Sequence, residues 1–123
     1  MTQNRTAVGA SAAPLDQALG LTRADDEGEW TVLRLEPADL AVGATEPVTY
    51  LHGGALATCV DTAAWEAMSR EHGTSWVVAD LRLDFVRLAG QETHKVRAKA
   101  RKVGRRQAVA DVEIAPWDQP DRV

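Results

Sequence analysis

Residues 50–65 read YLHGGALATCVDTAAW, and this stretch decides how the chain is organised. From Gly54 to about His72 the sequence contains no Pro and no further Gly, which predicts a helix of roughly five turns. Its first half is apolar almost all round, as is typical of a buried central helix. The Gly-Gly pair at its start exposes backbone N–H groups at the positive end of the helix, where they can bind a carbonyl oxygen or an oxyanion.

Asp61 stands in the middle of this apolar helix, where a carboxylate costs helix propensity and desolvation. It follows Gly54 by seven residues, so both lie on one side of the helix, flanked by Thr58 and Trp65. One interpretation is a reacting carboxylate. The alternative is a structural Asp that accepts a hydrogen bond from Thr58 or Thr62, or pairs with an arginine. Spacing alone does not separate the two.

The sequence on either side of this helix predicts one shorter helix and several strands. The helix is expected at residues 14–21, and the strands at residues 29–36, 76–88, 93–103 and 107–114. Val86 and Leu88 reverse the alternation of the second strand, which predicts a bulge near Phe85. His94 is expected to begin an exposed strand. The order predicts an α+β fold in which an antiparallel sheet wraps one long helix. Residues 14–123 are expected to form a single domain behind a flexible tail, residues 1–13.

The last two strands both place even-numbered residues on the core side. The residue numbers of two residues that lie opposite each other must therefore add up to an even number. A three- or five-residue loop centred near Arg105 meets this condition, whereas a two-residue turn does not. The three-residue loop predicts cross-strand pairs of opposite charge, Arg97 with Glu113 and Lys99 with Asp111. Arg105 and Arg106 stay unpaired at the turn.

The composition excludes several classes of protein. A net charge of -4 over 123 residues argues against general nucleic-acid binding. No apolar run approaches the roughly 18 to 20 residues that a membrane helix requires, and residues 1–13 lack the apolar core of a secretory signal. Cys59 is the single cysteine, which excludes an intrachain disulfide. Residues that could bind a metal ion are not clustered in the sequence, so no metal site is predicted. Cys59 itself is expected to be buried and unreactive. We expect a cytoplasmic protein.

Three motifs together resemble the phenylacetate-type branch of the hotdog-fold acyl-CoA thioesterase superfamily. His52-Gly53-Gly54, followed after six residues by Asp61, is similar to that branch's turn into its central helix. Residues 79–85, ADLRLDF, are similar to its next strand, and residues 102–105, KVGR, to its Gly-Arg turn. The combination spans roughly residues 30–114 and is far more specific than any single motif.

The resemblance implies hydrolysis of acyl-CoA-type thioesters, with CoA as part of the substrate and no other cofactor. It implies that the Gly53 N–H polarises the thioester carbonyl and that Asp61 attacks it or activates water, while His52 shapes the turn. Further substrate contacts are expected from Gly54, Thr58, Trp65, Glu46, Val78, Arg105 and Arg106. The alternatives are an acyl dehydratase of the same fold, which would need a longer His-containing loop, and a non-catalytic acyl-CoA binding subunit.

Two departures from the family pattern bear on these expectations. The family usually places Asn or Gln six residues before the His and Gly three before it, where this chain has Glu46 and Thr49. The family chain also continues past a turn like residues 117–121 into a final strand, which is expected to be missing here.

The spacing of Gly53 and Asp61 predicts a site shared between two subunits. Eight residues of helix rise about 12 Å, and an aspartate side chain reaches only some 3 Å from its backbone. One helix therefore cannot bring both groups to a single carbonyl. Two antiparallel helices related by a two-fold axis can, so we expect a homodimer, and the resemblance adds a possible homotetramer.

Overall fold

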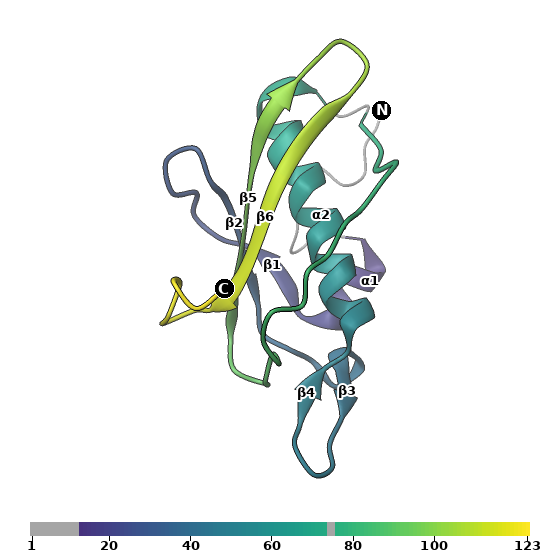
Figure 1. Ribbon diagram of the computed structural model, residues 1–123, viewed down its shortest axis with the longest axis vertical. Coiled ribbons are helices and arrows are strands. Elements are labelled where there is room, and N and C mark those ends of the chain that lie inside the picture. The colour runs from purple at the N-terminus through teal and green to yellow at the C-terminus, as the bar shows by residue number, and fades with distance from the viewer. Residues whose placement is uncertain (1–12, 74–75) are drawn as a thin grey trace.

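The computed structural model describes residues 13–73 and 76–123 (Figure 1). The predicted tail therefore lies almost entirely outside the described residues. The elements in chain order are α1 (Pro14–Leu19), β1 (Leu21–Arg23), β2 (Thr31–Leu35), the 3-10 helix η1 (Asp39–Ala41), β3 (Val42–Ala44), β4 (Tyr50–Leu51), α2 (Gly53–His72), β5 (His94–Val103) and β6 (Ala108–Pro116).

The long helix α2 lies along one face of a four-stranded antiparallel sheet with the order β1-β2-β5-β6 (Figure 1). A small second sheet, β3-β4, leads directly into the start of α2. This architecture confirms the predicted α+β fold with an antiparallel sheet around a central helix. Among the described residues, no helix is both long enough and apolar enough to cross a membrane.

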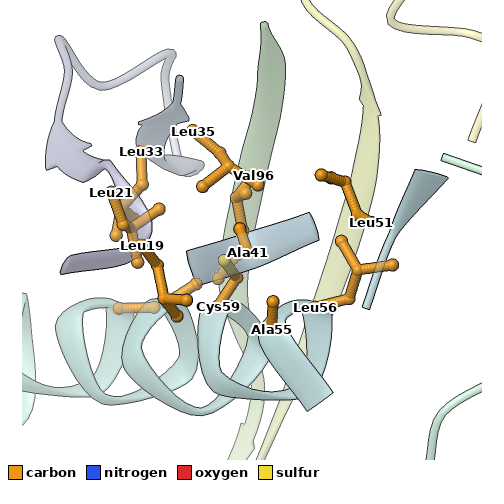
Figure 2. Close-up of a cluster of buried hydrophobic side chains, with 13 residues drawn as sticks. Leu19, Leu21, Leu33, Leu35, Ala41, Leu51, Ala55, Leu56, Cys59 and Val96 are labelled. Atoms are coloured by element: carbon orange, nitrogen blue, oxygen red, sulfur yellow. The ribbon is translucent and has the colours of Figure 1, made fainter. Parts of the chain in front are cut away.

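The core lies between α2 and the sheet (Figure 2). Cys59 and Ala63 of α2 are completely buried and belong to one cluster with Leu33, Leu35 and Val96 of the sheet. Burying a leucine side chain in this way contributes roughly 1.5 to 3 kcal/mol to stability. The cluster also fixes which side of α2 faces the sheet, and so which side is left for a functional site.

The pairing of β5 with β6 confirms the predicted charge register. Arg97 lies opposite Glu113 and their side chains form an ion pair, with Nη2 and Oε1 2.7 Å apart. Lys99 lies opposite Asp111 as predicted, although the Asp111 carboxylate contacts Arg101 instead, at 3.6 Å. The positive strip along β5 is therefore compensated in part by acids of the neighbouring strand.

The predicted loop of three or five residues in this hairpin is wrong. The Gly104 N–H donates to the Gln107 carbonyl at 2.8 Å, which leaves a two-residue turn, Arg105 and Arg106. The pairing shifts by one position between Ala100 and Lys102. This bulge places one extra residue in β5. Beyond it, the residue numbers of opposite residues add up to an even number, as predicted, although the turn itself has two residues.

The predicted strand at residues 76–88 is also wrong, because the described residues 76–93 contain no helix or strand. Its apolar side chains are largely exposed, with Val77 at 85% and Val86 at 72% of full exposure. Leu51 donates its N–H to the Ala89 carbonyl at 2.8 Å, which anchors the end of the segment beside β4. The alternating pattern is present, but a strand also needs a neighbouring backbone to pair with.

His94 does not begin an exposed strand as expected, because its side chain is only 2% exposed. It lies between Leu35 of β2 and Pro116 of β6 in the sheet. As an even-numbered residue of β5 it shares the core side with Val96 and Ala98, which explains its burial.

Candidate active site

His52 caps the start of α2 and is held there by the segment before it. Its backbone N–H donates to the Ala41 carbonyl at 2.8 Å. Gly43 of β3 makes this close approach possible, since a Cβ at that position would lie 2.8 Å from the His52 Cα. The η1–β3 segment thus fixes the point at which the chain turns into the helix.

Only one of the first backbone N–H groups of α2 is left for a ligand. The Gly54 N–H donates to His52 Nδ1 at 2.8 Å, and the N–H groups of Ala55 and Leu56 both donate to the His52 carbonyl. Within the described chain, the Gly53 N–H has no acceptor. It stands at the positive end of a 20-residue helix, where a partial negative charge is stabilised. The helix start can therefore polarise a carbonyl through Gly53, while Gly54 serves the turn itself.

Phe85 covers this helix start, which the sequence did not indicate. A Cβ at Gly53 would lie 3.5 Å from Phe85 Cζ, an ordinary contact distance. Phe85 is itself 61% exposed, so it forms the outer wall beside the Gly53 N–H. Phe85 was predicted only as the position of a bulge, because periodicity carries no information on which glycine a ring will face.

Asp61 lies on the side of α2 that faces away from the sheet. It is two residues from both Cys59 and Ala63, a rotation of about 200°, so it points nearly opposite to these buried residues. Its side chain is half-buried. No hydrogen bond or ion pair to Asp61 is found among residues 13–73 and 76–123.

The proposed structural partners of Asp61 are engaged elsewhere. Thr58 Oγ1 donates to the Gly54 carbonyl at 3.0 Å, and Thr62 Oγ1 donates to Asp16 Oδ1 at 2.7 Å. The structural interpretation required one of these hydroxyls or an arginine at the Asp61 carboxylate. The geometry therefore favours a carboxylate kept for a reaction.

The remaining predicted site residues do not gather around Asp61 in one chain. Trp65 is buried and Val78 is exposed, and both line a groove of about 1670 Å³ whose lining includes neither Asp61 nor Gly53. Glu46 is exposed between β3 and β4. Arg105 and Arg106 are exposed at the β5–β6 turn, which Figure 1 shows at the end of the molecule opposite to β3 and β4.

Two other groups with reactive side chains are unsuited to catalysis. Burial, with a smaller effect of Asp16, raises the pKa of the Cys59 thiol to about 12, so it stays protonated, as expected for a packing residue. Burial lowers the pKa of His94, which is therefore neutral at pH 7, with Nε2 3.4 Å from Glu92 Oε1. Within the described part of the chain, no three His, Cys, Asp or Glu side chains are grouped to hold a metal ion.

A long helix wrapped by an antiparallel sheet is the hotdog fold. Residues 49–122 match the family model described as "Thioesterase superfamily", so the chain belongs to the thioesterase superfamily. This membership supports thioester hydrolysis as the general activity.

Solved structures agree with this assignment. A protein from the thioesterase superfamily matches with a TM-score of 0.78 at 24% identity, over 86% of this chain and 80% of that one. The PaaI protein from the phenylacetic acid degradation operon of Escherichia coli has a TM-score of 0.68 at 25% identity, over 85% and 78%. A mutant of the phenylacetic acid degradation protein PaaI from Thermus thermophilus has a TM-score of 0.68 at 26% identity, over 84% and 86%. Among curated proteins, no sequence matches.

Proposed function

We propose that this protein hydrolyses acyl-CoA-type thioesters, with Asp61 as the reacting carboxylate and the Gly53 N–H as the group that polarises the carbonyl. The observation that carries the proposal is the state of the α2 start, where the Gly53 N–H has no acceptor among the described residues while the next three N–H groups are bonded to His52. A single free donor at a positive helix end suits one carbonyl oxygen.

The chemistry follows from these two groups. The thioester oxygen accepts the Gly53 N–H bond, which stabilises the negative charge that develops when the carbonyl carbon is attacked. Either the Asp61 carboxylate attacks, forming a mixed anhydride and expelling the CoA thiolate, and water then cleaves the anhydride, or Asp61 takes a proton from an attacking water. Both routes give a carboxylic acid and free CoA.

The site is proposed to form between two copies of the chain. Gly53 and Asp61 belong to one continuous helix, so their backbones are about 12 Å apart along its axis. A two-fold axis that sets two α2 helices antiparallel brings the start of one helix to the middle of the other. We propose a homodimer with two such sites, which can pair again into a homotetramer.

A panel of chromogenic CoA thioesters with short, long and aromatic acyl groups tests the proposed reaction. Hydrolysis is expected for at least one member, with free thiol and acid released in equal amounts. Hydration or dehydration of a matched enoyl or hydroxyacyl thioester without thiol release would identify the dehydratase instead. Binding without turnover would identify the non-catalytic subunit. The argument for that alternative is the exposed Glu46, which stands where the family usually has Asn or Gln.

Arg105 and Arg106 are proposed to contact the phosphates of CoA, because no acceptor is found for either guanidinium within the described chain. Each charge-assisted contact is worth about 1.5 to 3 kcal/mol. Replacing both with Ala is therefore expected to raise KM for a CoA thioester by roughly a hundredfold or more and to leave kcat unchanged.

The control substrate is the matching thioester of pantetheine, which lacks the phosphates and whose KM is expected to stay unchanged. Lys102→Ala removes one charge from the same hairpin outside the turn and serves as the control variant. Equal losses for the CoA and pantetheine substrates would contradict the phosphate role.

A further inference from the structure

His94 is a buried ionisable side chain that the proposed reaction does not use. It begins β5 between Leu35 of β2 and Pro116 of β6, and it is only 2% exposed. The next core-side residue of β5 is Val96, which is completely buried. Because a buried polar group loses its hydration, each ring nitrogen of His94 depends on the few polar groups of the protein within its reach.

The two ring nitrogens of His94 have different surroundings. Nε2 lies 3.4 Å from Glu92 Oε1, whereas Nδ1 is buried and makes no hydrogen bond to the described chain. A neutral imidazole carries one N–H, and placing it on Nε2 directs it at the Glu92 carboxylate. The neutral ring then leaves only an acceptor, Nδ1, without a partner.

Protonation of the ring is unfavourable at this position. An imidazolium carries an N–H on both nitrogens, and the one on Nδ1 would be a buried donor with nothing to bond. Burial lowers the pKa of His94, and the carboxylate and carbonyl of Glu92 oppose this effect only in part. A proton taken up below neutral pH therefore favours a conformation in which the ring reaches water.

The other charges around His94 do not change this balance. Its charged neighbours in the sheet, Arg34 and Lys95, lie over the Trp117 ring on the opposite face. Three titratable groups of α1 and α2 are buried, and each is bonded or neutral: Asp16 accepts the Thr62 hydroxyl, Glu66 pairs with Arg23, and Cys59 keeps its proton. Within the described chain, Glu92 is therefore the one charged group that acts on the ring.

The turn at residues 90–93 connects His94 to the start of α2. Ala89, just before this turn, accepts the Leu51 N–H at 2.8 Å. Leu51 in turn lies two residues before Gly53. Figure 1 shows that β5 begins at the same end of the molecule as α2. A movement of His94 out of the core would therefore pull on the backbone that holds the start of the helix.

We propose that His94 is an acid-sensitive switch for the start of α2. At and above neutral pH the ring is uncharged, stays in the core and keeps the turn in place. When the ring takes up a proton it leaves the core, the bond between Leu51 and Ala89 opens, and the helix start loses its support. The loss of activity that follows in mild acid rests on the proposed function, whereas the switch itself does not.

The pH window follows from the ordinary pKa of histidine and the direction of its shift. In the open conformation the ring reaches water and titrates near its ordinary pKa of 6.5, whereas burial lowers the pKa in the closed conformation. The closed conformation is therefore fully favoured above about pH 6.5 and loses stability as the pH falls below that value. One such group raises the equilibrium constant for opening by up to roughly tenfold at about pH 5.5.

Hydrogen exchange of the Leu51 amide tests the switch without an activity assay. Its protection, corrected for the intrinsic pH dependence of exchange, is expected to fall severalfold, by up to about tenfold, between about pH 7.5 and 5.5. The amides of Cys59 and Ala63, in the buried part of α2, are expected to keep theirs. Equal losses at all three amides would indicate global unfolding and contradict a local switch. Unchanged protection of Leu51 overturns the proposal.

Two substitutions of His94 remove the titration in different ways. His94→Leu fills the position with an apolar side chain, and His94→Gln keeps an N–H donor for Glu92 but takes up no proton. Both variants are expected to keep the Leu51 protection constant between the two pH values. His72→Leu, the same change at the exposed end of α2, is the control and is expected to leave the acid response intact. An acid response that persists in both His94 variants overturns the switch.

The pH dependence of kcat links the switch to hydrolysis. With the best thioester of the panel, the ratio of kcat in mild acid to kcat at neutral pH is expected to be severalfold higher in both His94 variants than in the unmodified protein. The same ratio in all variants would contradict the coupling of His94 to the helix start. A pH response of the Leu51 amide in a protein that hydrolyses no thioester would overturn the proposed function and leave the switch standing.

Discussion

Asp61→Asn is expected to lower the turnover number by a factor of roughly a hundred or more, the scale of losing an acid, base or nucleophile. Asparagine keeps the shape of the side chain but neither attacks a thioester nor accepts a proton from water. The measurement is kcat for the best substrate of the CoA panel, with KM determined alongside. Because the change removes chemistry and not binding, KM is expected to move little.

The fold is expected to survive this substitution. Asp61 is half-buried and has no bonding partner among the described residues, so an amide in its place breaks no hydrogen bond or ion pair there. Asp16 is the contrasting case, a buried carboxylate that accepts the hydrogen bond of Thr62 at 2.7 Å. The two aspartates thus contrast the carboxylate that we propose to react with one that has a structural partner.

Asp118→Asn, a change of the same chemistry at an exposed turn, serves as the control and is expected to keep full activity. Thermal unfolding of both variants should match that of the unmodified protein. Near-normal turnover of Asp61→Asn with the best substrate would show that Asp61 is not the reacting carboxylate, whatever its thermal unfolding shows.

The elements that sequence reasoning predicted correctly depend on local periodicity. The α2 helix follows from an unbroken apolar run, and the opposition of Arg97 to Glu113 follows from the parity of two adjacent strands. Each of these features is fixed within one helix or within two strands that follow each other in the chain. The bulge between Ala100 and Lys102 was not predicted, because it inserts one residue where the composition is uniform.

The misassigned segment, residues 76–88, failed for a different reason. Its alternation predicts a strand, but its apolar side chains are largely exposed, with Phe85 at 61% although its ring lies near Gly53. A strand also needs a neighbouring backbone to pair with, and no strand of the described residues lies beside this segment. A pattern in one sequence cannot tell whether the partner strand belongs to the same molecule or to another.

The sequence singled out the residues of the candidate site but could not give their hydrogen bonds. The His-Gly-Gly run pointed to the helix start, yet the His52 side chain decides that the Gly54 N–H is bonded, while the Gly53 N–H has no acceptor in the described part of the chain. Likewise, the spacing left Asp61 with two interpretations until Thr58 and Thr62 were seen to bond elsewhere. Side-chain hydrogen bonds of this kind depend on tertiary packing, which spacing does not encode.

Mixing two inactive variants is expected to restore activity if the site is shared between subunits. The first variant is Asp61→Asn, and the second is Gly53→Leu. At Gly53 a Cβ alone would already contact Phe85 at 3.5 Å, so a leucine must displace the ring or fill the space in front of the N–H. Gly53→Ala adds only that Cβ and is the milder control.

The expected activity follows from counting sites. In a heterodimer, one site combines the unmodified Gly53 of the first variant with the unmodified Asp61 of the second, and the other site carries both defects. Each heterodimer is therefore expected to work at about half the rate of the unmodified dimer. Random exchange of equal amounts makes about half of all dimers mixed, so the mixture should reach about a quarter of full activity.

The alternative, a site within one chain, requires the Gly53 N–H and the Asp61 carboxylate to reach one carbonyl from positions about 12 Å apart on one helix. Under that alternative every chain in the mixture carries one defect, and no combination recovers activity. Native mass spectrometry verifies that heterodimers have formed before the assay. A verified heterodimer without activity, or an unmodified monomer that turns over substrate in solution, would rule out the shared site.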